Sequence, residues 1–202
     1  MNRRTKFLFI CITVLFAFSA LTVYAVSPRY MLAFKWPDVP CTLFWDCGTF
    51  TSSQRTAIQN AMHVWNAVQA TDGSELLLSV VTTDSSLTDN QIFVDYIADS
   101  KAIAKTYPTP ETGYLQNVII RLSKNSTFTI GATSNSYDLQ SVVMHELGHA
   151  YGIAHCHEEG EASPCSITGC PNNVMNRTLA KNTNRRVLTT YDIINYQYIY
   201  VS

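Results

Sequence analysis

Residues 145–155 of the chain read HELGHAYGIAH. His145 and His149 are four residues apart, so a helix would place their imidazole rings on one face. Gly152 can adopt the positive φ that ends a helix, after which the chain can turn back and bring His155 to the same point. Three imidazole nitrogens with an open fourth position are typical of catalytic rather than structural zinc. The spacing therefore predicts one zinc ion held by these three histidines.

The glutamate beside the first histidine indicates what such a site would do. Glu146 is placed to act as general base, taking a proton from a zinc-activated water and passing it to a leaving amine. The expected reaction is hydrolysis of an internal peptide bond in a protein or peptide substrate, with no covalent acyl-enzyme. A zinc-bearing binding or adhesion module with the same fold and no turnover is the alternative. The intact Glu146 favours the protease.

The eleven-residue pattern and the later stretch NVMN, residues 173–176, resemble the defining motif and methionine turn of metzincin zinc endopeptidases. The resemblance implies that Met175 lies beneath the zinc ligands as a hydrophobic base. Among metzincins the chain most resembles the compact bacterial-type matrixins. YDLQSVVM (137–144) resembles the approach to their zinc helix, and LTTYD (188–192) resembles the entry to their last helix. The likeness runs over most of residues 34–200.

Some positions depart from the matrixin pattern. Cys156 stands where matrixins usually have serine, and the cysteine-rich loop before Met175 resembles pappalysin-like metzincins, which are the alternative subfamily. Arg177 occupies the place of the tyrosine ligand of astacins and serralysins, so no fifth ligand is expected. Animal matrixins carry a zinc-and-calcium loop between the third and fourth strands, whereas only about residues 99–101 connect these strands here. The comparison with that family therefore predicts no second zinc.

The resemblance implies an α+β fold in which a twisted, mixed, five-stranded sheet packs on three helices. Capping boxes and apolar spacing predict the helices at 52–69, from the N-cap Asp138 through about 151, and after Thr189. Strands are expected within 34–45 and at 76–82, 91–98, 102–107 and 118–122. Pro108 is expected to end the fourth of these strands.

The resemblance also implies that the substrate lies extended beside an edge strand. By position, that strand is the fourth one, and its free backbone groups would pair with the peptide. The candidate substrate-binding residues are Ala102, Ile103, Ala104, Lys105, Thr106 and Tyr107.

The chain has 202 residues, of which 47% are hydrophobic and 14% charged, which argues against a disordered or nucleic-acid-binding protein. Residues 1–25 combine a basic start, an uncharged apolar run and the small-residue ending VYA, which predicts a secretory signal peptide. An uncleaved anchor is the alternative. Cleavage removes three of the 14 basic residues and none of the 15 acidic ones, leaving a catalytic domain at 26–202 with a formal charge of −4. We expect a secreted monomer without stable membrane association.

Five cysteines follow the expected cleavage point, and their odd number allows up to two disulfides with the pairing left open. They are Cys41, Cys47, Cys156, Cys165 and Cys170. Calcium, which the family often uses, is an open alternative for the acidic residues, although they lack the spacing of an EF-hand. His63 and His157 are expected to be structural or solvent-facing.

Overall fold

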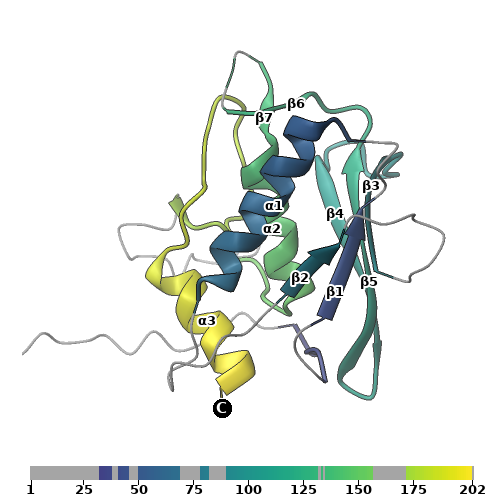
Figure 1. Cartoon of the computed structure of the whole chain (residues 1–202), viewed down its shortest axis with the longest axis vertical. Helices are drawn as coiled ribbons and strands as arrows, with labels where there is room; N and C mark the ends of the chain where they lie inside the picture. The colour runs from purple at the N-terminus through teal and green to yellow at the C-terminus, as the bar shows by residue number, and fades with distance from the viewer. Residues whose placement is uncertain are drawn as a thin grey trace, which may run out of the picture.

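The computed structural model describes residues 32–37, 41–45, 50–68, 78–81, 90–131, 133, 135–156 and 172–201. Seven strands and three helices lie along these residues (Figure 1). In chain order they are β1 (Cys41–Trp45), α1 (Ser52–Asn66), β2 (Leu78–Val81), β3 (Gln91–Asp95), β4 (Ala104–Glu111), β5 (Tyr114–Ser123), β6 (Phe128–Thr129), β7 (Tyr137–Asp138), α2 (Leu139–Ala150) and α3 (Thr190–Val201).

The larger sheet has the strand order β2-β1-β3-β5-β4. Neighbouring strands run parallel except for the last pair, because β4 returns antiparallel to β5 through a tight hairpin. Thr112 and Gly113 both have positive φ values, 50° and 85°, as hairpin turns require. By the strand order, β2 and β4 are the two outer strands, and one edge of β4 is unpaired within the described sheet.

The fourth strand differs from the sequence expectation at both ends. It begins at Ala104, so Ala102 and Ile103 precede it, and it continues through Pro108 and Pro110 to Glu111. The prediction that Pro108 ends the strand is wrong, because a proline can lie in an edge strand without removing a needed ladder hydrogen bond. The register shifts between Thr109 and Pro110, where the strand accommodates the second proline.

A second small sheet also differs from expectation. The sequence predicted one sheet and a loop between the last strand and the second helix, but β6 and β7 in that loop pair parallel to each other. Hydroxyl groups hold this segment together: the Oγ atoms of Thr129 and Ser136 lie 2.7 Å apart. The backbone N–H of Tyr137 donates to the carbonyl of Thr127. Local polar contacts of this kind leave no hydrophobic periodicity in the sequence.

The α+β class, the mixed sheet and the three helices agree with expectation. Thr51 and Gln54 form the predicted capping box of α1, which ends at Asn66, three residues earlier than expected. Asp138 caps α2 as predicted, with its side chain accepting from the N–H of Ser141. Thr189 and Asp192 form the capping box before α3.

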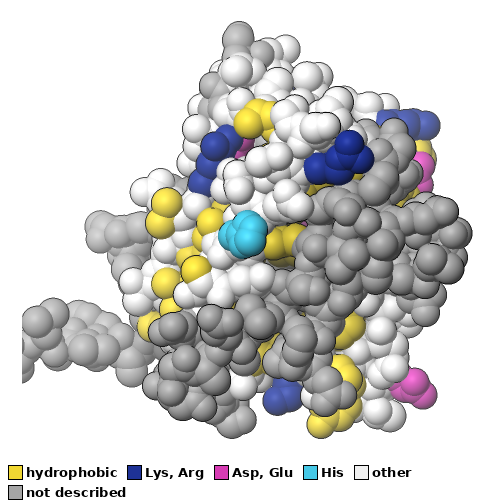
Figure 2. Space-filling view, viewed as in Figure 1, with side chains coloured by type: hydrophobic (Ala, Val, Ile, Leu, Met, Phe, Trp, Pro, Cys, Tyr) yellow, Lys and Arg dark blue, Asp and Glu magenta, His cyan; other side chains and the backbone are white. Residues whose placement is uncertain are grey.

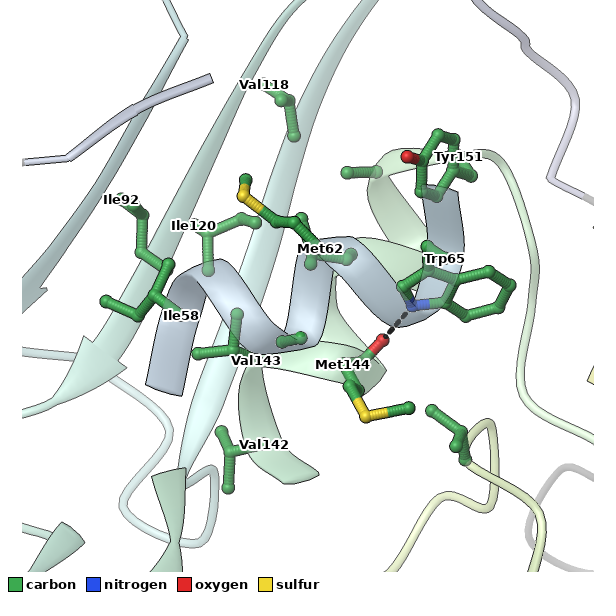
Figure 3. Packing of buried hydrophobic residues seen from close by; sticks show 14 of the residues in the cluster. Ile58, Met62, Trp65, Ile92, Val118, Ile120, Val142, Val143, Met144 and Tyr151 are labelled. Atoms are coloured by element: carbon green, nitrogen blue, oxygen red, sulfur yellow. Dashed lines mark hydrogen bonds between the residues drawn. The ribbon is translucent and has the colours of Figure 1, made fainter. Parts of the chain in front are cut away.

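The core lies between the larger sheet and the two central helices, which lie side by side on one of its faces (Figure 1). Figure 3 shows apolar side chains from α1 and α2 meeting those of β3 and β5. The indole N–H of Trp65 donates to the backbone carbonyl of Met144 at 2.9 Å, which fixes α1 against α2. Trp65 also contacts Tyr151 and, on α3, Tyr196, so one aromatic cluster joins all three helices.

Some expectations concern residues outside the described ranges. This group comprises the signal peptide, the cysteines at 47, 165 and 170, and His157. Within the described residues, no helix combines the length and apolar character that crossing a membrane requires.

Candidate functional site

Three histidines converge at the end of α2. The Nε2 atoms of His145 and His149 lie 3.1 Å apart, His149 and His155 are also 3.1 Å apart, and His145 and His155 are 3.2 Å apart. His145 and His149 come from successive turns of the helix, as their spacing predicted. His155 comes from the segment after it. Each side chain offers one nitrogen to a group that could hold a metal ion.

The other ring nitrogens determine which tautomer two of these histidines adopt. Nδ1 of His145 lies 2.8 Å from the carbonyl oxygen of Val174, and Nδ1 of His149 lies 2.7 Å from that of Ile153. A carbonyl oxygen only accepts, so each Nδ1 carries the proton and each Nε2 presents a lone pair. Burial, with repulsion from the other imidazoles, holds the pKa of His145 well below its usual value and keeps that ring neutral.

The donor set fits zinc. A tetrahedral ion with zinc–nitrogen distances of about 2.0–2.1 Å requires ligand nitrogens about 3.3–3.4 Å apart, close to the separations found here. Lone pairs that face one another at this distance repel, and a cation among them removes that repulsion. The three imidazoles could thus hold Zn²⁺ and leave a fourth coordination position open.

The turn that brings His155 to the site depends on Gly152. The helix ends at Ala150, and Gly152 then takes a φ of 89°. A Cβ at this position would lie 2.5 Å from the carbonyl oxygen of Phe34, so the N-terminal segment also packs tightly against the turn. The predicted helix break is present, and a tertiary contact adds a second requirement for glycine.

Beneath the histidines lies Met175, which is fully buried. Its sulfur packs against Gly148 of α2, between the two helical histidines in sequence. The carbonyl of Met175 accepts from the N–H of Cys156, which fixes the position of the residue after His155. Met175, which the resemblance implied to lie beneath the zinc ligands, thus packs on the helix that carries two of the histidines.

A buried carboxylate holds the methionine turn from below. The two oxygens of Asp192 accept from the backbone N–H groups of Val174 and Met175, each at 3.2 Å, and one oxygen also accepts from the N–H of Thr189. Burial raises the pKa of Asp192 above its usual value, although these hydrogen bonds oppose the shift. Asp192 therefore has two roles: it belongs to the capping box of α3, and it orients the methionine turn.

Glu146 faces the edge strand. Its side chain is 4% exposed, and its Oε2 accepts from the hydroxyl of Thr106 on β4 at 2.6 Å. Burial raises the pKa of Glu146 to about 7, against the opposing effect of the hydrogen bonds from Thr106. A divalent cation among the neighbouring histidines would lower this pKa by attraction.

The segment after the methionine turn is joined to the start of α2. Arg186 donates from Nε and Nη2 to the two oxygens of the buried Asp138. The backbone N–H of Arg185 donates to the hydroxyl of Ser141 at 2.7 Å. Although burial raises the pKa of Asp138, the hydrogen bonds from Arg186, Ser141 and Gly131 outweigh it and leave the pKa below its usual value.

Sequence patterns located the histidines, Glu146 and Met175, but they missed several partners. They missed the contacts made by Thr106, Gly148 and Arg186, and the hydrogen bonds from the methionine turn to Asp192. Each of these contacts joins residues 17 to 48 positions apart. Periodicity carries no signal for contacts of this range. His63 lies exposed on α1, away from this cluster, as expected. Cys156 is buried, with a hydrogen bond between its thiol and Asn173.

Comparison with known proteins agrees with this geometry. The family model described as Matrixin matches residues 46–201, which includes all three histidines, Glu146 and Met175. No curated protein sequence matches the chain. Matrixins are zinc metalloendopeptidases. The sequence left matrixins and pappalysin-like metzincins open as subfamilies, and the match is to the matrixins. Because the match spans more than three quarters of the residues, the chain belongs to the matrixin family.

Proposed function

We propose that the chain is a secreted, zinc-dependent endopeptidase. The observation that carries the proposal is the position of a buried glutamate beside three convergent imidazoles. His145, His149 and His155 place their Nε2 atoms within 3.2 Å of one another, and Glu146 directly follows the first of them on the same helix. A site built only to hold metal has no need of this carboxylate.

The proposed roles follow from the positions of these groups. When bound, a zinc ion supplies a Lewis acid that polarises the substrate carbonyl and makes water more acidic. Glu146 accepts the proton from the attacking water and returns it to the leaving amine. The carbonyls of Val174 and Ile153 keep two of the imidazoles in the tautomer that can bind metal.

The proposed substrate is an extended peptide that pairs with the unpaired edge of β4. This strand contacts α2, so a peptide along it would pass close to Glu146. Of the residues named from the sequence, Ala104, Lys105, Thr106 and Tyr107 lie in the strand. Backbone pairing with an edge strand binds peptides with little dependence on their side chains.

Partners and location complete the proposal. Figure 2 shows that the basic side chains described on this face lie apart from one another, which supports a substrate other than nucleic acid. A signal peptide at residues 1–25 would export the domain at 26–202 as a monomer. One zinc ion per chain is proposed.

A zinc-bearing module without turnover is the competing function, and one variant separates the two. Glu146→Gln keeps the size of the side chain and removes the base. The protease proposal expects this variant to hold one zinc per chain, as the wild type does, and to lose cleavage of a casein or peptide-library substrate by at least about a hundredfold. Equal cleavage by both proteins would contradict the assigned role of Glu146.

The metal is tested separately. A chelator should abolish cleavage and added Zn²⁺ should restore it. His149→Ala should lower bound zinc well below one per chain, whereas His63→Ala, an exposed histidine on α1, should leave zinc content unchanged. A wild-type protein that holds zinc and cleaves nothing in a broad peptide library would favour the binding module.

A further inference from the structure

We propose that Thr106 is a positioning residue for the Glu146 carboxylate, an inference that rests on the proposed function. The juxtaposition is a threonine hydroxyl on the edge strand 2.6 Å from a carboxylate oxygen on the zinc helix. The two residues are 40 positions apart in the sequence. The hydrogen bond thus links the strand proposed to bind substrate to the side chain proposed to move the proton.

The pleat of β4 directs this hydroxyl toward the helix. Thr106 pairs across the ladder with Ile120 of β5, which is fully buried, so both residues lie on the face that packs on the helices. The neighbouring residues Lys105 and Tyr107 lie on the opposite face, where the Lys105 ammonium and the Arg121 guanidinium both lie over the Tyr107 ring. In the strand, Thr106 is therefore directed at α2.

One hydroxyl serves two acceptors on the same glutamate. The Oγ1 atom lies 2.6 Å from Oε2 of Glu146 and 3.0 Å from its backbone carbonyl oxygen. Because a hydroxyl has a single proton, it donates to one acceptor at a time. The shorter distance and the charge of an ionised carboxylate favour Oε2.

This contact restricts the glutamate side chain. A carboxylate on a freely rotating side chain would sample several rotamers, and only some of them reach the open position beside the histidines. A donor at Oε2 selects one orientation and leaves Oε1 to receive the proton of the attacking water. Thr106 does not touch the reacting atoms, so its effect on catalysis acts through Glu146.

The inference is tested by a pair of substitutions at one position. Thr106→Val keeps the branched shape and removes the hydroxyl, whereas Thr106→Ser keeps the hydroxyl. We expect Thr106→Val to lower kcat by about ten- to a hundredfold with KM within about twofold of wild type, and Thr106→Ser to stay within about threefold in both. Thr56→Val on the exposed surface of α1, where the hydroxyl donates to a backbone carbonyl, is the matched control and should match wild type.

A second readout does not depend on turnover. Crystal structures of the zinc-loaded variants should show the Glu146 carboxylate displaced or in several rotamers in Thr106→Val, and in one orientation in Thr106→Ser and wild type. If the wild type holds zinc without cleaving peptides, the proposed function fails while the orientation of Glu146 still tests the inference.

Three results would overturn the role of Thr106. A Thr106→Val protein with wild-type kcat and an undisturbed Glu146 would show that the hydroxyl is dispensable. Equal impairment of Thr106→Val and Thr106→Ser would show that the threonine acts through strand packing. A rise in KM with unchanged kcat would assign the residue to substrate binding instead.

Discussion

The sulfur atom of Met175 lies 2.1 Å from the point that a Cβ at position 148 would occupy, so the methionine beneath the histidines fits only against glycine. Gly148 sits between His145 and His149 on the helix that carries them both. The methyl group of Met175 and the Trp65 ring also lie within 3.2 Å of that point. The glycine of the zinc motif therefore sets how closely the methionine turn approaches the helix.

Gly148→Ala should destabilise the protein although alanine is the better helix former. The added methyl group has no space beside Met175, and overpacking of this kind costs about 1–3 kcal/mol. Urea unfolding should give a lower free energy of unfolding, and bound zinc should fall because the turn carries the carbonyl that orients His145.

A second substitution tests whether the contact with Met175 causes this loss. In the Gly148→Ala/Met175→Ala double variant, the removed sulfur leaves room for the new methyl group. Its free energy of unfolding should exceed the value expected from adding the two single losses, as it does for residues in contact. Strictly additive losses would assign the effect of Gly148→Ala to Trp65 or to the backbone.

The requirement for glycine at Gly152, in the turn that brings His155 to the site, can be tested with Gly113 as a matched control. Their φ values are 89° and 85°, but a Cβ at Gly152 would meet the Phe34 carbonyl, whereas nothing lies within 4 Å of one at Gly113. Gly113→Ala should cost only the backbone strain, about 1–2 kcal/mol. Gly152→Ala should cost more and should weaken zinc binding. Equal losses of stability would show that the Phe34 contact relaxes freely.

The ion pair of Asp138 and Arg186 predicts a pH-dependent stability. The pKa of Asp138 is lowered from 3.8, so its charged form contributes stability above pH 3.8, and this contribution is lost as the pH falls through the folded-state pKa. Asp138→Asn should cost about 1–3 kcal/mol near neutral pH and keep a side chain that caps helices well. The difference in free energy of unfolding from wild type should shrink on acidification. A difference that stays constant from pH 7 to pH 2 would contradict this assignment.

Backbone methylation of a substrate tests the pairing with β4. In a series of peptides with one N-methyl group at successive positions around the cleaved bond, alternate positions should show weaker binding, because only every second residue of a paired strand faces its neighbour. Each lost hydrogen bond should raise KM up to about tenfold. A flat series, or one in which only the residue at the cleaved bond matters, would place the substrate elsewhere.

Local patterns in the sequence were sufficient for some elements and not for others. The capping boxes at Thr51 and Thr189 and the break at Gly152 were correct because the groups that decide them are four residues apart or fewer. The end of β4 was predicted incorrectly. Whether Pro108 ends a strand depends on which of its edges is paired, and that follows from the strand order rather than from the neighbouring residues.

The sequence alone predicted which side chains meet at the candidate site, because a helix with a period of 3.6 residues places His145 and His149 together and Glu146 beside them. The tertiary structure decided the surroundings of that site. It brought Thr106 and Met175 to the helix from positions at least 25 residues away, and Asp192 to the methionine turn, by burying apolar faces whose pairing no local pattern specifies. The desolvation that shifts the pKa values of the buried Glu146 and the partly buried His145 exists only once those faces have packed.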